Sequence, residues 1–362
     1  MMKIRALIVD DSIVMRKLIA EVLSLDGQIE VVGTASNGRI ALQRIPQVNP
    51  DVITLDVEMP EMDGVQALRE LRLKYPKLPV IMFSALTHKG AAATLDALSA
   101  GANDYVTKPL DSSDLADSIE RLKADLLPKI HVHCDAFVVP PPRMAEPAQL
   151  PADGDASARR QRKAPVDLIC IGASTGGPVA LEKLFAQFPS ALPVPVAIVQ
   201  HMPPMFTQLM AQRLDSLKGP VRCVEAENGM ILKPGFAIIA KGGHHLALAR
   251  DSGRCFQARL TDTPPENSCR PAVDVLFRSA AGTGSNVLGV VLTGMGQDGL
   301  RGSKHIREGG GQVIAQDQAT SVVWGMPGAV VQARLANCVL PIGEIAFEIA
   351  RRVKNGLGPK ES

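Results

Sequence analysis

Short apolar runs alternate with longer polar segments in which apolar residues recur every three or four positions. Apolar runs rich in Val and Ile are typical of buried parallel strands, and the longer periodic segments are typical of amphipathic helices. The first third of the chain has five such runs, each followed by a helical pattern: 4–9, 30–35, 52–55, 80–83 and 104–107. This repetition predicts a doubly wound, flavodoxin-like parallel α/β sheet.

The periodic pattern stops in the middle of the chain. Prolines and small polar residues punctuate residues 127–165, which also hold the basic run Arg159–Lys163. Such a stretch predicts a stiffened linker between two compact units. The sequence therefore predicts one domain at 3–126 and a second at 166–357.

Strands and helices alternate again in the second domain. The predicted buried strands are 166–171, 196–199, 221–224, 287–292 and 312–315. Three short segments at 236–240, 246–249 and 255–260 are separated by glycine-rich or charged turns, and this predicts antiparallel hairpin strands. The second domain is therefore expected to be a Rossmann-like α/β sheet with a small antiparallel insertion.

Composition limits the classes of function. A net charge of +2, without runs of Lys and Arg among aromatics, gives no reason to expect a nucleic-acid partner. The sequence has no apolar stretch of ~20 residues, so membrane insertion is not predicted. The six cysteines are scattered along the chain. This spacing predicts reduced thiols in the core of a cytoplasmic protein. His131, His133 and Cys134 lie close together, but without a further ligand pair they favour a polar connector over a metal site.

Polar residues occupy the carboxyl ends of the first domain's strands, where ligand groups converge in such sheets. Asp10, Asp11 and Asp56 end two of them, and Ser84 and Lys108 end two others. Each alone is more simply a helix cap or a solvated charge. Together, three carboxylates require a hard cation such as Mg²⁺. Asp56 could then accept a phosphoryl group while the other two carboxylates hold the metal.

With these residues, the first domain resembles the response-regulator receiver family. The matching positions are Asp10-Asp11, Asp56, Met59-Pro60, Asp63-Gly64, Ser84, Tyr105 and Lys108-Pro109. The resemblance implies phosphorylation of Asp56 by a phosphohistidine kinase. It also implies a switch in which Ser84 closes on the phosphoryl group and Tyr105 turns inward.

A glycine-flanked serine, Ser174, follows the first strand of the second domain, and Pro178 begins a helix after it. This turn has three interpretations: a dinucleotide-binding turn, a nucleophile turn and a serine that only caps the helix. The serine replaces the second glycine of the dinucleotide pattern, and the next strand ends without an acid for a ribose. These two departures count against nucleotide binding.

Two further strand ends favour a nucleophile. His201 and Asp298 follow strands of the same predicted sheet and could supply the base and the acid that a serine nucleophile requires. Asp298 could instead cap a helix. Three other histidines are alternative bases, two in a hairpin turn and one within a helix: His244, His245 and His305.

The second domain resembles the chemotaxis protein-glutamate methylesterases at residues 172–177, 200–203 and 293–299. That resemblance implies hydrolysis of γ-glutamyl methyl esters on methyl-accepting chemoreceptors and, in many members, deamidation of glutamines. It implies that Ser174 is the nucleophile, His201 the base and then the acid, and Asp298 the residue that orients it. The Met295 amide would donate to the oxyanion, with Thr175 as a supporting residue, and no cofactor is expected in this domain.

Joined to a receiver, such a domain is expected to be inhibited until Asp56 is phosphorylated. Two alternatives remain at this stage. One is a signalling adaptor whose second domain is inactive. The other is an enzyme acting on a small ester or a nucleotide under receiver control.

Overall fold

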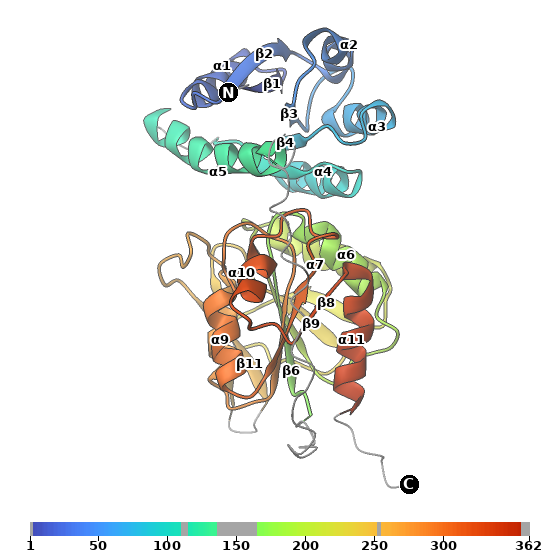
Figure 1. The fold of residues 1–362 in the computed structure, drawn as a ribbon, viewed down its shortest axis with the longest axis vertical. Coiled ribbons are helices and arrows are strands. Elements are labelled where there is room, and N and C mark those ends of the chain that lie inside the picture. The colour runs from blue at the N-terminus through green and yellow to red at the C-terminus, as the bar shows by residue number, and fades with distance from the viewer. Residues whose placement is uncertain (1–2, 110–114, 136–164, 252–254, 356–362) are drawn as a thin grey trace. The chain divides into compact units, whose positions relative to one another are not determined.

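The computed structural model describes residues 3–109, 115–135, 165–251 and 255–355. They form two compact units, each with its own parallel sheet (Figure 1). The predicted fold class, two doubly wound α/β sheets with a small antiparallel insertion, is confirmed. The basic run Arg159–Lys163 lies outside the described residues. No helix in the described ranges has the length and apolar content needed to span a bilayer.

The first unit has a sheet of five parallel strands in the order β2-β1-β3-β4-β5. The strands are β1 (Ile4–Val9), β2 (Ile29–Ala35), β3 (Val52–Asp56), β4 (Val80–Ser84) and β5 (Asp104–Thr107). The helices that follow them are α1 (Ile13–Ser24), α2 (Gly38–Val48), α3 (Gly64–Lys74), α4 (His88–Ser99) and α5 (Leu115–Asp135).

Side-chain caps fix where the first three helices begin. Ser12, Asn37 and Asp63 each accept a hydrogen bond from the backbone N–H three residues later. Such bonds satisfy donors that a helix leaves without an intrahelical partner. The apolar faces of α1 and α5 pack against β1 and its neighbours in one core.

Helix α5 continues beyond the predicted end near Leu126, into the stretch assigned to the linker. Its buried positions Leu122, Leu126, Ile130 and Cys134 recur every four residues, so the same helix face remains in the core. Pro128 lies inside the helix and does not end it. The apolar repeat, rather than the proline, determines how far this helix runs.

The histidines and the cysteine near the end of α5 face different neighbours. His131 Nε2 lies 2.7 Å from Asp26, His133 Nε2 lies 3.7 Å from Asp104, and Cys134 Sγ donates to a backbone carbonyl. Each of the three side chains therefore has a different neighbour.

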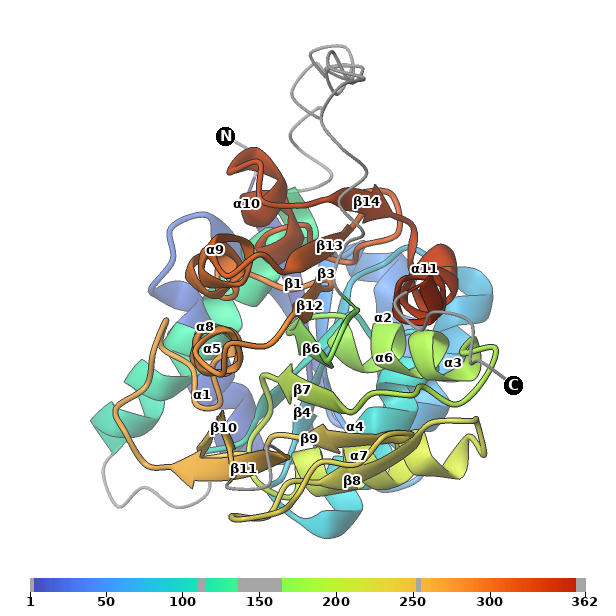
Figure 2. The same ribbon diagram turned by 90° about the horizontal axis from the view of Figure 1, so that it is seen from below.

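The second unit has a parallel sheet of seven strands in the order β14-β13-β12-β6-β7-β9-β8. Its strands are β6 (Leu168–Ala173), β7 (Val196–Gln200), β8 (Arg222–Glu225), β9 (Phe236–Ile239), β12 (Val287–Val291), β13 (Gln312–Gln316) and β14 (Cys338–Leu340). Its helices are α6 (Gly177–Ala186), α7 (Phe206–Ser216), α8 (Val273–Ala281), α9 (Leu300–Glu308), α10 (Met326–Gln332) and α11 (Ile342–Asn355). Figure 2 shows α8 and α9 on one side of this sheet and α6 and α11 on the other.

The antiparallel insertion is smaller than predicted. It consists of β10 (His245–Arg250) and β11 (Phe256–Thr261), which pair with each other. The segment expected to be a third hairpin strand is β9, which joins the main sheet parallel to both β7 and β8. The connection from β8 to β9 is short and has no helix. It nevertheless brings the chain back to the end of the sheet where β8 begins, so the two strands run parallel. Helix α10 and strand β14 have no counterpart among the predicted elements.

The β10–β11 hairpin is held against the sheet layer by apolar packing. Leu248 and Phe256 from the hairpin join Leu276 and Phe277 of α8 in the main core of the unit. The guanidinium of Arg250 lies over the Phe256 ring, 4.9 Å from its centre. This packing holds the end of β11, from which the loop to α8 begins.

We predict that Gly64→Ala destabilises the first unit. A Cβ there would lie 2.0 Å from the backbone oxygen of Asp56, so the chain after β3 would have to move. The expected loss is about 2 kcal/mol in the free energy of unfolding, measured by urea denaturation. Gly27→Ala is the matched control, because no atom lies within 4 Å of the place that its Cβ would occupy. Equal transition midpoints for the two variants would contradict the prediction.

Candidate active site

Three neighbouring strands of the second unit bring the predicted triad to one edge. β6 pairs with β7 on one side and with β12 on the other. The chain leaves β6 toward β7 and later returns to β12, so the direction of strand addition reverses here. Ligand sites of open α/β sheets lie at such a reversal. Ser174, His201 and Asp298 all lie beyond the carboxyl ends of these three strands.

The turn at Ser174 is fixed by backbone contacts. Ser174 N donates to Thr293 O at 3.0 Å, and its own carbonyl accepts from Gln200 Nε2 at 3.0 Å. A Cβ on Gly177 would lie 2.0 Å from Gln200 Oε1, and one on Gly294 would lie 2.7 Å from Ser174 Cβ. The glycines therefore permit the close packing that holds this half-buried serine.

The predicted base and acid form a close pair. His201 Nε2 lies 2.8 Å from Asp298 Oδ2. Because an ionised carboxylate only accepts hydrogen bonds, Nε2 carries the proton, and Nδ1 is the nitrogen left to accept another. Burial lowers the pKa of His201, but the hydrogen bonds with Asp298 and Cys269 outweigh burial and raise it to about 9.

Asp298 is almost completely buried and surrounded by donors. Its carboxylate accepts from the backbone N–H groups of Val273 at 2.6 Å and Asp274 at 2.9 Å, at the start of α8. Asn267 Nδ2 and Gly299 N also donate to it. Burial raises the pKa of Asp298, but His201 and the backbone N–H groups of Val273 and Asp274 lower it by more, so the net shift is downward.

Ser174 and His201 come from adjacent strands but are not hydrogen-bonded through their side chains. His201 N donates to Ala173 O at 3.1 Å, which places the two turns side by side. Within the described ranges, no hydrogen bond joins Ser174 Oγ to the imidazole. Nδ1 instead faces the thiol of Cys269, with the sulfur at 3.4 Å.

The predicted oxyanion donors lie beside the serine. Met295 follows Gly294, which packs directly against Ser174. In the part of the chain that the structure describes, Met295 N makes no hydrogen bond to another residue. Thr175 is buried, and its carbonyl accepts from Thr293 Oγ1 at 2.9 Å. Among the described residues, Met295 thus has a free donor, whereas Thr175 helps to hold the turn.

The other histidines have different partners. Both ring nitrogens of buried His245 bond to backbone, Nδ1 to Ala272 N and Nε2 to Pro264 O. His244 pairs with Asp262, and His305 bonds to a carbonyl of its own helix. Each of these three histidines therefore bonds to a residue other than Ser174.

Sequence reasoning missed two residues that touch the pair. Cys269 lies on His201, and Asn267 lies on Asp298. Both belong to the loop between β11 and α8, which carries no strand-end signal. The sequence favours core positions for the cysteines, whereas Cys269 is only half-buried.

The first unit carries the second predicted site. Carboxylate oxygens of Asp10, Asp11 and Asp56 lie within 4.8 Å of one another. Lys108 Nζ lies 2.8 Å from both Asp10 Oδ2 and Asp56 Oδ2. Burial raises the pKa of Asp56 to about 6, although the lysine acts in the opposite direction. An oxygen-only set of this kind fits a hard cation such as Mg²⁺.

Ser84 and Tyr105, two of the three residues predicted for the receiver switch with Lys108, lie on the adjacent strands β4 and β5. Ser84, at the end of β4, is fully buried, and its hydroxyl donates to Ala85 O at 3.2 Å. Tyr105 of β5 is also buried, with Lys129 Nζ 5.3 Å from its ring centre. Asp10, Asp11, Asp56 and Ser84 therefore lie at the carboxyl ends of the neighbouring strands β1, β3 and β4. Tyr105 lies on β5 beside them, and Lys108 directly follows that strand.

Comparison with known proteins identifies both units. Residues 6–120 match the response regulator receiver domain, and residues 169–349 match the CheB methylesterase family. A protein-glutamate methylesterase/protein-glutamine glutaminase of Trichodesmium erythraeum (strain IMS101) is 52% identical, over 98% of this chain and all of the relative. One with the same name from Nocardioides sp. (strain ATCC BAA-499 / JS614) is 51% identical, over 97% of this chain and 95% of the relative.

A solved structure gives the same result for the second unit. The crystal structure of the Thermotoga maritima CheB methylesterase catalytic domain is 40% identical, with a TM-score of 0.50. The match covers 52% of this chain and 99% of that domain. The resemblance predicted from the motifs is confirmed: this chain belongs to the CheB methylesterase family, in the form that carries a response-regulator receiver domain.

Proposed function

We propose that this chain is a protein-glutamate methylesterase that removes methyl groups from glutamyl esters of chemoreceptors. The observation that carries the proposal is the 2.8 Å pair of His201 and Asp298 beside the fixed turn of Ser174. A base held by an acid, next to a serine hydroxyl, is the arrangement that activates a serine nucleophile. The names of the relatives support the substrate class.

In the first half of the reaction, Ser174 Oγ attacks the ester carbonyl and forms a C–O bond. Its proton passes to His201 Nδ1, because Nε2 stays bonded to Asp298. The negative charge moves to the carbonyl oxygen, where the Met295 N–H can donate to it. The intermediate then collapses, the ester C–O bond breaks, and His201 returns the proton to the departing methanol.

In the second half, water attacks the acyl group on Ser174, and His201 removes one of its protons. Breakdown releases the glutamate carboxylate and restores the serine hydroxyl. A glutamine side chain can follow the same route with ammonia as the leaving group. We include this deamidation in the proposal because the relatives' names include glutaminase.

We also propose that phosphorylation of Asp56 by a phosphohistidine kinase relieves inhibition by the receiver. Asp10, Asp11 and Asp56 would hold Mg²⁺, which when bound neutralises charge on the incoming phosphoryl group. The lysine at 108 supports the same role, since its ammonium already lies beside two of these carboxylates. A cytoplasmic location is supported by the six free thiols.

An inactive adaptor is the weaker alternative. An adaptor would have no need for a buried acid paired with a base at a strand-end serine. Burying such a pair costs solvation free energy. A catalytic role gives a reason for the pair to be present despite this cost, whereas stability of the fold does not. A nucleotide-dependent enzyme is disfavoured because the comparisons identify a methylesterase family.

We predict that Ser174→Ala abolishes methanol release from methylated receptor, with a loss of at least ~10⁴-fold in kcat. The nucleophile is absent in this variant, whereas the fold is preserved because the serine side chain has no hydrogen bond among the described residues. Ser24→Ala, at an exposed serine of the first unit, serves as the control and should retain full activity. Unchanged methanol release by Ser174→Ala would refute the esterase assignment.

The pH dependence should reflect the raised pKa of His201. The base must be neutral to accept a proton, so kcat/KM should increase with pH through an inflection near 9, above the ordinary value of about 6.5. Asp298→Asn removes the main group that raises this pKa. The inflection should then move to lower pH, and kcat should fall by roughly 10³–10⁴-fold. Asp262→Asn, at the exposed partner of His244, should change neither quantity.

Control by the receiver can be tested with a small phosphodonor such as acetyl phosphate. We predict that wild-type methanol release accelerates when the donor and Mg²⁺ are added, and that a metal chelator removes the acceleration. Asp56→Asn should keep the basal rate and lose the response, because it has no carboxylate to phosphorylate. Acceleration of the Asp56→Asn variant would show that another residue mediates the effect.

A further inference from the structure

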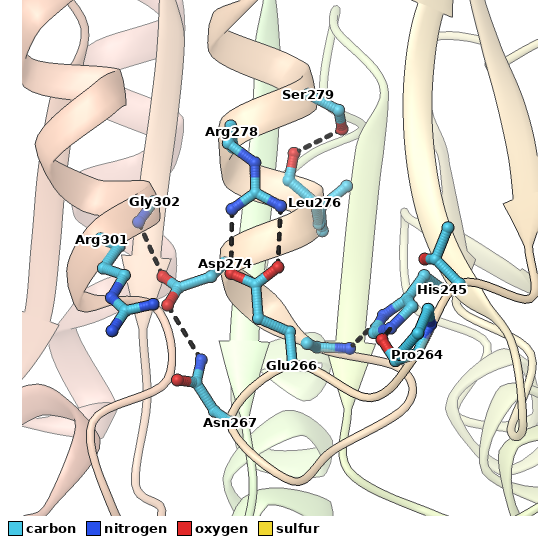
Figure 3. Close-up of polar contacts among 12 residues, drawn as sticks. His245, Pro264, Glu266, Asn267, Asp274, Leu276, Arg278, Ser279, Arg301 and Gly302 are labelled. Carbon is cyan, nitrogen blue, oxygen red and sulfur yellow. Dashed lines mark hydrogen bonds and ion pairs between the residues drawn. The ribbon is translucent and has the colours of Figure 1, made fainter.

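One side-chain amide lies between two buried carboxylates at the edge of the candidate active site. Asn267 Nδ2 lies 2.8 Å from Asp298 Oδ1 and 2.9 Å from Asp274 Oδ2. Figure 3 shows Asn267 extending from its loop toward Asp274, on the first turn of α8. Since both neighbours are acceptors, the amide must direct its NH₂ group at them, and each hydrogen serves one carboxylate.

Asp274 is the fixed end of this arrangement. It is 1% exposed, and its Oδ1 accepts from Gly302 N at 2.7 Å, at the start of α9. Burial raises the pKa of Asp274, whereas the pKa of Asp298 is lowered. The shared amide thus lies between two carboxylates whose pKa values are shifted in opposite directions.

The loop that carries Asn267 is held at several points. Glu266 and Cys269 exchange two backbone hydrogen bonds, and Arg278 donates to both carboxylate oxygens of Glu266 at 2.9 and 2.8 Å. His245 bonds to Pro264 O earlier in the same loop (Figure 3). Asn267 has φ of 53°, a left-handed conformation that asparagine tolerates better than most residues.

The loop touches both members of the proposed base–acid pair. Asn267 donates to Asp298, and Cys269 lies on the free nitrogen of His201. The oxygen of Asp298 that accepts from His201 is Oδ2, and the one that accepts from Asn267 is Oδ1. The amide therefore restrains rotation of the carboxylate without competing for the oxygen that faces the imidazole.

We propose that Asn267, anchored by Asp274, is a positioning residue that orients Asp298 toward His201. This inference rests on the proposed esterase function, which assigns the imidazole its role as base. An aspartate at 267 could not donate and would add a third negative charge. An alanine would remove the donor to Asp274 Oδ2 and the side-chain donor to Asp298 Oδ1, which would keep only the backbone N–H groups of Asp274 and Gly299.

The test compares Asn267→Ala, Asn267→Asp and the double variant Asn267→Asp with Asp274→Asn. In each case kcat for methanol release should fall by about 10- to 100-fold with little change in KM, as for other residues that orient a functional group. In Asn267→Asp the added charge should also shift the pH inflection of kcat/KM upward. In the double variant the buried charge is restored, so the inflection should return toward the wild-type value while kcat stays low.

Asn337→Ala is the matched control. Asn337 also joins two elements through its side chain, accepting from Val313 N and Arg307 at the opposite end of the strands. Loss of these bonds should lower the unfolding temperature but leave kcat and the pH inflection unchanged. If Asn267→Ala and the double variant keep wild-type kcat, the proposal is wrong. The double variant also decides the question if Asn267→Asp alone does not fold.

An NMR titration of the His201 imidazole separates this inference from the function on which it depends. The ring pKa should rise in Asn267→Asp and return in the double variant, whether or not a substrate is present. If Ser174→Ala still releases methanol, the esterase proposal fails, and the titration still tests Asn267. If Ser174→Ala is inactive but the His201 pKa is the same in all Asn267 variants, the positioning role alone is overturned.

Discussion

A carboxylate buried in the second unit has to be surrounded by donors, and much of the local architecture follows from that requirement. An isolated charge in such a place would cost several kcal/mol of solvation free energy. Asp298 avoids this cost through an imidazole, a side-chain amide and three backbone N–H groups. These donors come from the turn after β7, the β11–α8 loop, the first turn of α8 and the start of α9. All four segments must therefore converge on one point.

The strand order makes that convergence possible. β6 lies between β7 and β12, so the segments that follow these strands meet without long connections. The same principle operates in the first unit, where Asp10 and Asp56 follow adjacent strands and Lys108 lies between their carboxylates. In both units a parallel sheet concentrates buried charge at its carboxyl edge, and ion pairs offset the loss of hydration.

Most of the fold, and the meeting of the candidate site residues at two sheet edges, could be predicted because they depend on local patterns. Apolar runs located the central strands, and polar residues directly after them marked both sites. The errors arose where the outcome depends on tertiary packing. The glycine-rich turn after β9 suggests a hairpin, and Pro128 suggests an early end to α5, but packing against the core overrides both signals. The contacts of Asn267 and Cys269 depend on a loop path that no periodicity encodes. The exact domain boundaries stay predictions.

The orientation of the imidazole also limits where its partner can come from. His201 directs its outer nitrogen, Nε2, to the acid, which leaves Nδ1, the nitrogen nearer its own main chain. A nucleophile that exchanges a proton with Nδ1 must approach within a short radius of the histidine backbone. The strand hydrogen-bonded to β7 on this side is β6, so Ser174 follows the nearest strand from which such a nucleophile could come. Proton exchange at Nδ1 therefore depends on β6 and β7 being neighbours in the sheet.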